Sequence, residues 1–172
     1  MNKSILVAYS GEFGTTREVA EVIGQTLRDA NTEVDVREII DVRELAPYQA
    51  VIVGSAIYNG TWLPEAVEFV RFFEAILSRM PVAYFAISMT MRNDTPASRR
   101  TVLAYLDPLH TAAPAVQPVG IGLFAGRLQY VNLPLIARLF FWLQSRLPSG
   151  DFRNWNTIQE WVREIRPALV SG

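Results

Sequence analysis

Short apolar runs alternate along this chain with longer stretches in which apolar residues recur every three or four positions. The short runs, rich in β-branched residues, predict five strands, at residues 4–9, 33–39, 50–54, 82–88 and 116–124. The longer stretches predict helices at 15–30, 63–77, 96–106 and 157–170, and the last of them would have Asn156 as its N-cap. This alternation is typical of an α/β fold, a parallel sheet covered by helices on both faces.

Residues 126–155 form an insertion between the fifth predicted strand and the last helix, where a simple fold of this class needs only a few residues. Within the insertion, the pattern predicts a very apolar helix at 132–147, interrupted by Arg138 and Arg146, which is too short and too charged to span a bilayer. With 172 residues, the chain can bury one substantial core but not two. We therefore expect a single domain over residues 1–172.

The composition excludes several kinds of chemistry. There is no cysteine, which excludes disulfides, thiol nucleophiles and cysteine-bound iron–sulfur clusters. The single histidine, His110, excludes a multi-histidine metal site, and its place at a predicted helix end indicates a surface residue without a catalytic role. We expect no metal site. Redox chemistry would have to come from a bound cofactor.

The charge is unevenly distributed although the net charge is only −1. Residues 1–74 sum to −6 and residues 75–172 to +5, and 15 of the 16 cationic residues are arginines. Arginine suits carboxylate and phosphate groups, but there is no lysine-rich patch, so nucleic-acid binding is poorly supported. The sequence begins without a basic leader or a long apolar stretch, which favours a cytoplasmic location.

The loop after the first predicted strand is the first candidate for a ligand site, because ligands of open parallel sheets bind beyond the carboxyl ends of the strands. A helix N-terminus follows the loop, and its unpaired N–H groups, its dipole and the loop hydroxyls suit a terminal phosphate. The loop lacks the lysine of a Walker motif and the third glycine of a dinucleotide fingerprint. On spacing alone, ordinary turn chemistry explains it equally well. Its residues are Ser10, Gly11, Glu12, Phe13, Gly14, Thr15 and Thr16.

Three segments together resemble the flavodoxin-like family: residues 9–20, 54–62 after the third strand and 88–92 after the fourth. The resemblance implies a doubly wound, five-stranded parallel sheet in the order 2-1-3-4-5, with the helical insertion after the fifth strand. It also implies an FMN cofactor whose phosphate lies on the first loop. The other two loops would enclose the isoalloxazine ring through Ser55, Ala56, Ile57, Tyr58, Asn59, Gly60 and Trp62, and through Ser88, Met89 and Thr90.

Some of these residues can be given roles. Tyr58 is expected to stack on the ring, while Trp62 either stacks as well or packs beneath the loop. Gly60 would permit a close approach of the backbone. Glu12 departs from the hydroxyl or basic residue usual in the family. Because a carboxylate repels a phosphate, we expect Glu12 to turn to solvent and to contribute only its backbone N–H.

Within the family, the chain is most similar to the menaquinone-dependent protoporphyrinogen dehydrogenase branch, through residues 55–58, 126–130 and 149–155. That resemblance implies an FMN-dependent oxidoreductase with a hydrophobic substrate and a quinone acceptor. Two alternatives stay open: an electron carrier without its own substrate, against which the net charge of −1 argues, and a flavin-free interaction module. Helix 132–147 would meet the inner face of the membrane, shape a quinone or porphyrin pocket, cover the sheet edge or form a homodimer.

Overall fold

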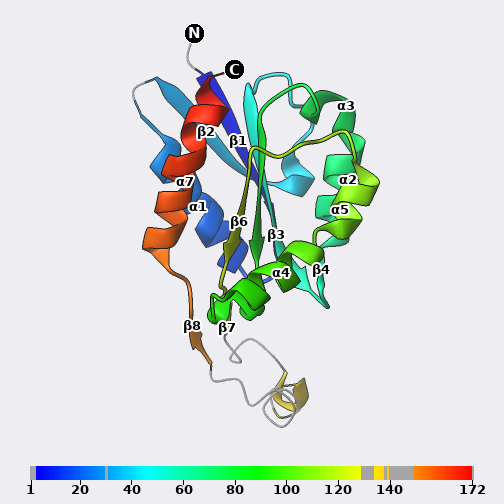
Figure 1. Cartoon of the computed structure of the whole chain (residues 1–172), viewed down its shortest axis with the longest axis vertical. Helices are drawn as coiled ribbons and strands as arrows, with labels where there is room; N and C mark the ends of the chain where they lie inside the picture. The colour runs from blue at the N-terminus through cyan, green and yellow to red at the C-terminus, as the bar shows by residue number, and fades with distance from the viewer. Residues whose placement is uncertain (1–2, 30, 129–133, 138, 140–148, 172) are drawn as a thin grey trace.

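A parallel sheet forms the centre of the protein in a computed structural model that describes residues 3–29, 31–128, 134–137, 139 and 149–171 (Figure 1). Its strands run in the order β2-β1-β3-β5-β6, and a short strand, β4, pairs antiparallel with β3. Apart from this added hairpin strand, the predicted order 2-1-3-4-5 is confirmed. The strands are β1 (Lys3–Ser10), β2 (Thr32–Glu38), β3 (Ala50–Tyr58), β4 (Thr61–Trp62), β5 (Val82–Ile87) and β6 (Gly120–Phe124).

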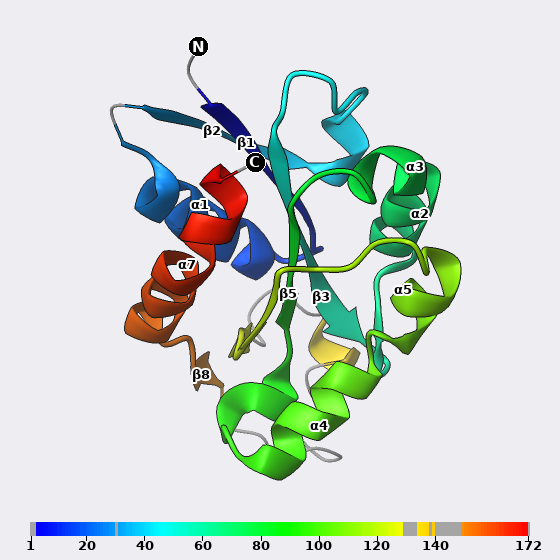
Figure 2. The same cartoon turned by 45° about the horizontal axis from the view of Figure 1, so that its top comes forward.

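Helices cover both faces of the sheet (Figures 1 and 2). Alternate residues of β1 are buried in two separate cores: Ile5 and Val7 beneath one helical layer, Leu6 and Ala8 beneath the other. This period-two burial on both faces explains why β1 is continuously apolar. One layer contains α1 (Thr15–Leu27) and α7 (Trp155–Val170), and the other α2 (Pro64–Phe72), α3 (Glu74–Leu77), α4 (Pro96–Ala104) and α5 (Asp107–Ala112).

One predicted helix is divided in the structure, and another ends two residues early. The helix predicted at 63–77 breaks at Phe73, whose backbone leaves the helical region at φ −95° and ψ 10°. The helix predicted at 96–106 ends at Ala104. Pro108 lacks the N–H that would bond to the Ala104 carbonyl, so the chain starts a separate helix, α5. His110 is exposed in the last turn of α5, as predicted.

Strand β3 is longer than predicted. The sequence placed its end at Gly54, but the strand continues to Tyr58. Gly54 pairs with Phe85 of β5, and a Cβ built on Gly54 would lie 1.9 Å from the Phe85 ring. The glycine therefore makes room for an aromatic side chain within the sheet and does not end the strand.

The start of the last helix is also corrected. Asn154, and not Asn156, is the N-cap of α7, and its side chain accepts a hydrogen bond of 3.2 Å from the Thr157 N–H. Asn156 lies inside the first turn with its side chain exposed. The helix begins earlier because Trp155 packs against the core beneath α1 and α7.

The two asparagines form a matched test of this cap. Asn154→Ala is expected to lower the free energy of unfolding by ~1 kcal/mol, because one N–H of the helix start loses its acceptor. In a domain of this size the melting temperature should fall by about 2–4 °C. Asn156→Ala should leave thermal unfolding, followed by circular dichroism, almost unchanged. Equal effects of the two substitutions would contradict the assignment.

The ends of the insertion meet at the carboxyl end of the sheet, at the bottom of Figure 1. There β7 (Arg127–Leu128) pairs antiparallel with β8 (Gly150–Asp151). Most of the helix predicted at 132–147 lies outside the described residues; of those described, 135–137 and 139 are helical. Leu135 and Ile136 are 80% and 85% exposed. Across the described ranges, none of the helices has the length and apolar content needed to cross a membrane.

Candidate functional site

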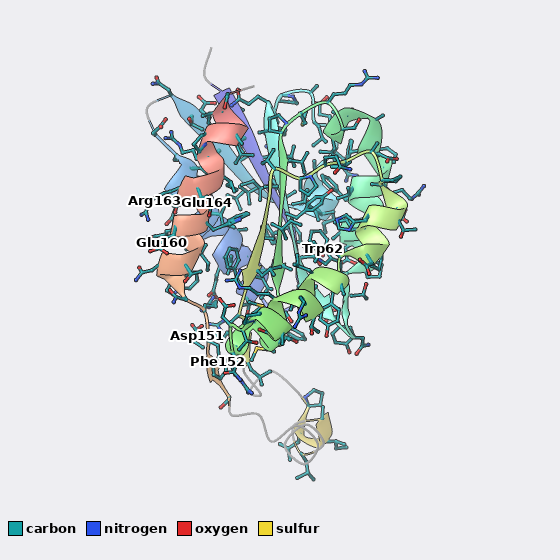
Figure 3. All side chains as sticks on the ribbon, viewed as in Figure 1. Trp62, Asp151, Phe152, Glu160, Arg163 and Glu164 are labelled. Atoms are coloured by element: carbon teal, nitrogen blue, oxygen red, sulfur yellow. The ribbon has the colours of Figure 1, made fainter. Side chains whose placement is uncertain are left out.

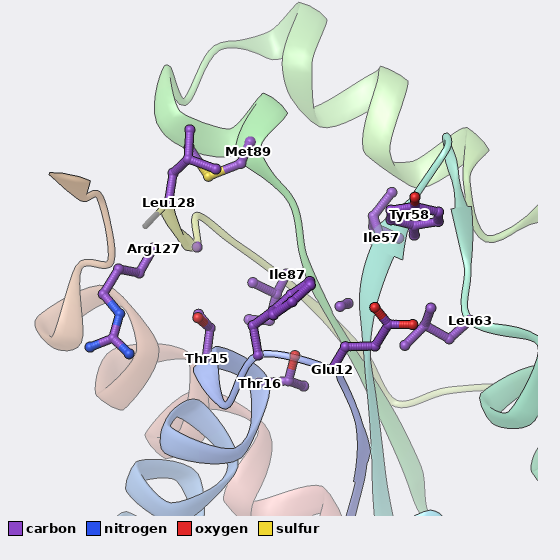
Figure 4. A pocket seen from close by; sticks show the side chains of 13 residues that line it. Glu12, Thr15, Thr16, Ile57, Tyr58, Leu63, Ile87, Met89, Arg127 and Leu128 are labelled. Carbon is purple, nitrogen blue, oxygen red and sulfur yellow. The ribbon is translucent and has the colours of Figure 1, made fainter. Parts of the chain in front are cut away.

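A cavity of about 210 Å³ lies beyond the carboxyl ends of the strands (Figure 4). The three loops singled out in the sequence meet here, although they are far apart along the chain. A fourth wall, residues 126–128 at the start of the insertion, was not predicted. It follows β6, so the rule that ligands bind beyond the strand ends also points to it. The lining residues are Glu12, Phe13, Thr15, Thr16, Ala56, Ile57, Tyr58, Leu63, Ile87, Met89, Gly126, Arg127 and Leu128.

The first loop brings the start of α1 to this cavity. Gly14 is the N-cap of α1 at φ +78°, and no side chain caps the helix. Thr15 and Thr16 follow it and line the cavity. The first-turn N–H groups, which have no partner within the helix, are thus free to bind an anion beside two hydroxyls. Gly11 is needed for this arrangement, because a Cβ there would lie 2.4 Å from Thr16 Oγ1.

Ser10 has another partner. Its side chain is buried, and its hydroxyl donates a hydrogen bond of 2.6 Å to Glu65 Oε1 in the first turn of α2. Ser10 therefore joins β1 to α2 and is not among the residues that line the cavity. Of the three hydroxyl residues in the loop, Thr15 and Thr16 remain next to the candidate phosphate position.

The position of the Glu12 side chain agrees only partly with the expectation that it turns to solvent. Its side chain is exposed, but it lies along the cavity wall between the loop and Leu63, below Tyr58 in Figure 4, and not away from the cavity. Phe13, the next residue, is 63% exposed and also lines the cavity. The exposed edge of the site lets the Glu12 carboxylate stay hydrated while its chain covers the wall.

The second loop is a hairpin between β3 and β4. Asn59 and Gly60 both have positive φ, 50° and 73°, as in the type I′ turns that favour Asn-Gly. The Asn-Gly dipeptide is the sequence signal for this hairpin, and hence for strand β4, which was not predicted. The turn places Tyr58 opposite Thr61, and Tyr58 is 59% exposed at the mouth of the cavity. Neither Asn59 nor Gly60 lines the cavity.

Trp62 packs in the core, the second of the two positions considered for it (Figure 3). It is 1% exposed, and its ring meets the edge of Tyr84 with 5.6 Å between centroids. Ser55 is also structural, since its fully buried hydroxyl accepts the Leu63 N–H at 3.0 Å and donates to the Ala56 carbonyl at 2.8 Å. These two residues support the hairpin from below, and neither lines the cavity.

The third loop contributes mainly Met89. Ser88 is buried, and its hydroxyl accepts the Thr90 N–H at 3.2 Å, which caps the 3-10 helix η2 (Met89–Arg92). Thr90 itself is exposed and lies outside the cavity lining. Met89 thus faces the cavity because Ser88 holds the turn.

Four charged residues form a group that we call the clasp: Glu18, Arg127, Asp151 and Arg153. Arg153 is almost buried, pairs with Glu18, and bonds Asp151 Oδ2 at 2.6 Å. Arg127 Nη2 lies 3.3 Å from Glu18 Oε1. Because Glu18 is in the first turn of α1, the clasp joins the paired ends of the insertion to the helix that borders the cavity. The hydrogen bond from Arg153 lowers the pKa of the Asp151 carboxyl.

The lowered pKa of Asp151 predicts an acid-sensitive contribution to stability. A carboxyl whose pKa is lower in the folded state stabilises the fold above its ordinary pKa of 3.8, and this contribution is lost as the pH falls through the folded value. Asp151→Asn should therefore lower the melting temperature at pH 7, and the difference from the wild type should shrink towards pH 3. Glu160→Gln, at an exposed position of α7 (Figure 3), is the control. A pH-independent difference for Asp151→Asn would contradict the prediction.

A family model described as a flavodoxin domain matches residues 6–153. The chain belongs to the flavodoxin family. Membership agrees with the sheet order and with the cavity beyond the strand ends, and it implies a flavin cofactor. The resemblance identified in the sequence is confirmed.

Two curated proteins with the name protoporphyrinogen IX dehydrogenase [quinone] are similar to this flavodoxin domain. The Leishmania major protein is 26% identical over 152 residues, which cover 85% of this chain and 64% of that protein. The chain thus spans less than two thirds of the Leishmania protein. The protein of Escherichia coli strain K12 is 22% identical over 173 residues, which cover 93% of each.

Solved flavodoxin structures share the fold. Oxidised flavodoxin 2 from Bacillus cereus superposes with a TM-score of 0.59 at 20% identity, covering 98% of both chains. A short-chain flavodoxin associated with a bacterial microcompartment gives a TM-score of 0.56 at 14% identity, covering 98% of this chain and 97% of that one. At such identities the likeness establishes the architecture alone.

Proposed function

We propose that this flavodoxin domain binds FMN and acts as an oxidoreductase of the protoporphyrinogen dehydrogenase type, with a quinone as acceptor. The observation that carries the proposal is the cavity, in which an uncapped helix start meets apolar walls from three other segments. The names of the two relatives support this choice of reaction.

The residues present fit the two ends of FMN. The first turn of α1, with Thr15 and Thr16, provides N–H and hydroxyl donors for the phosphate. At the other end Tyr58 offers an exposed aromatic face for stacking, opposite the thioether of Met89 (Figure 4). Ile57, Ile87 and Leu128 would exclude water from the ring. When bound, FMN supplies the hydride and electron transfer, and the protein supplies position and electrostatics.

A hydrophobic substrate agrees with the character of the insertion. Leu128 lines the cavity, and farther along the same segment Leu135, Ile136 and Leu139 are each at least 59% exposed. Exposed apolar side chains at this end of the sheet suit a quinone or porphyrin better than a small polar metabolite. We propose that the substrate approaches the ring from this side.

The absorption spectrum of the purified full-length chain is the first test. Flavin absorption bands, retained on gel filtration or restored by adding FMN, are the expected result. A colourless protein that cannot be reconstituted would favour the flavin-free interaction module instead.

Turnover separates the remaining candidates. The FMN-loaded protein should oxidise protoporphyrinogen with a menaquinone analogue as acceptor. Inactivity both with and without lipid vesicles would overturn the enzymatic proposal while leaving FMN binding intact. Under that result, reduction of the flavin in two well-separated one-electron steps would identify an electron carrier.

A further inference from the structure

The candidate phosphate position is poor in positive charge. The loop from Ser10 to Thr16 contains no cationic residue and includes Glu12. A further carboxylate, Glu65, accepts the hydrogen bond from Ser10. A phosphate monoester carries nearly two negative charges at neutral pH, so carboxylates nearby oppose its binding unless a cation compensates for them.

Among the described residues that line the cavity, one is cationic, Arg127. The preceding residue, Gly126, passes close to the phosphate loop, since a Cβ built on it would lie 3.8 Å from Thr15 Cγ2. In Figure 4 the Arg127 guanidinium lies on the same side of the cavity as Thr15. Its side chain is 26% exposed, so its field is less screened by water than that of an open surface arginine.

Among the described residues, the clasp engages only part of the Arg127 guanidinium. Glu18 already pairs with the almost buried Arg153, which also bonds Asp151. Arg127 is held to Glu18 by one contact of 3.3 Å, from Nη2. A guanidinium has five N–H donors in a planar fork, so Arg127 can bind an anion without leaving Glu18 uncompensated.

We propose that Arg127 binds the 5′-phosphate of the flavin together with Thr15, Thr16 and the first turn of α1, and thereby selects FMN over riboflavin. Glu18 is a positioning residue that aims Arg127 at the phosphate. The inference rests on the proposed function, because it concerns the phosphate end of the same cofactor. It makes the insertion part of cofactor recognition and not only of substrate binding.

The test compares dissociation constants for FMN and riboflavin, measured by quenching of flavin fluorescence with the full-length protein. Arg127→Met keeps an unbranched apolar stem but removes the guanidinium and its charge, and it should raise the FMN constant by about 10- to 100-fold, the effect of losing charged hydrogen bonds. The riboflavin constant should change by less than about twofold, since that ligand has no phosphate to lose contact with. Arg127→Lys should recover part of the FMN affinity because it restores the charge without the fork.

Arg17→Met is the matched control. Arg17 is also at the start of α1, but its side chain is 66% exposed, pairs with Glu21 at 3.7 Å and does not line the cavity. Both flavin constants should stay at their wild-type values.

Several outcomes would overturn the inference. If Arg127→Met weakens both flavins equally, Arg127 shapes the cavity and does not read the phosphate. If Arg127→Met changes neither dissociation constant, or if Arg17→Met raises the FMN constant as much, Arg127 has no special role in binding the phosphate. A wild-type protein that binds riboflavin but shows no preference for FMN also overturns it while leaving flavin binding intact, whereas one that binds neither flavin overturns the proposed function itself.

Discussion

Gly54→Ala is expected to lower the free energy of unfolding by ~3 kcal/mol, at the upper end of the usual cost of overpacking a core. The added methyl would lie 1.9, 2.1 and 2.4 Å from three ring atoms of Phe85. The ring has no free space to move into, because Phe85 is fully buried and packs beside Phe124 with 6.5 Å between centroids. Strands β3 and β5, in the middle of the sheet, would have to separate.

Denaturant unfolding of a double-mutant cycle measures this clash. Phe85→Leu alone leaves space above Gly54, so Gly54→Ala should cost much less in the Phe85→Leu background than in the wild type. The coupling energy should be about 1–2 kcal/mol and favourable, as for residues in direct contact. Additive effects of the two substitutions would mean that the cost at Gly54 has another origin.

Gly11→Ala is expected to raise the dissociation constant for FMN by about 100-fold while the domain stays folded, which is the loss of about two charged hydrogen bonds. The new Cβ would lie 2.4 Å from Thr16 Oγ1 and 2.8 Å from Thr16 Cβ. Because Thr16 is 2% exposed, it cannot rotate away alone, and the first turn of α1 must shift with it. Fluorescence titration with FMN measures the loss, and circular dichroism checks the fold.

Gly14→Ala is the control within the same loop. Nothing lies within 4 Å of a Cβ built on Gly14, and a methyl group has no oxygen that could accept the first-turn N–H groups. The positive φ at this position costs about 1–2 kcal/mol of stability, which circular dichroism also measures. FMN affinity should stay within about threefold of the wild type. If both variants kept their affinity, the start of α1 would not hold the phosphate.

The sheet could be predicted because its signals are local. Apolar runs marked the inner strands, whose residues are buried beneath both helical layers, whereas alternating apolar and charged residues marked β2 at the edge of the sheet. The predicted ends of elements were wrong where the conformation of a residue depends on packing against other parts of the structure. The Phe85 ring from another strand fills the space beside Gly54. Trp155 packs against the core, so α7 begins before Asn156.

The site could be predicted only to the level of its loops. Tyr58 and Met89 do reach the cavity, whereas Ser10, Ser55 and Ser88 bond to the protein itself. A hydroxyl in a loop has the same appearance in the sequence whether it faces a ligand or a neighbouring backbone group. The fourth wall and the clasp depend on contacts across more than a hundred residues of sequence, which no local pattern contains.

The pairing of β7 with β8 also affects how the segment between these strands can change in evolution. Leu128 and Gly150 are partners in register, and the Phe152 N–H bonds the Gly126 carbonyl just behind them. Because loop closure costs only ~0.6 kcal/mol for each doubling of length, a change in the length of the sequence between these two residues adds little to the cost of bringing them together. Under the proposed function, changes in the length of this segment would alter the approach of the substrate while Arg127 and the start of α1 stay in place.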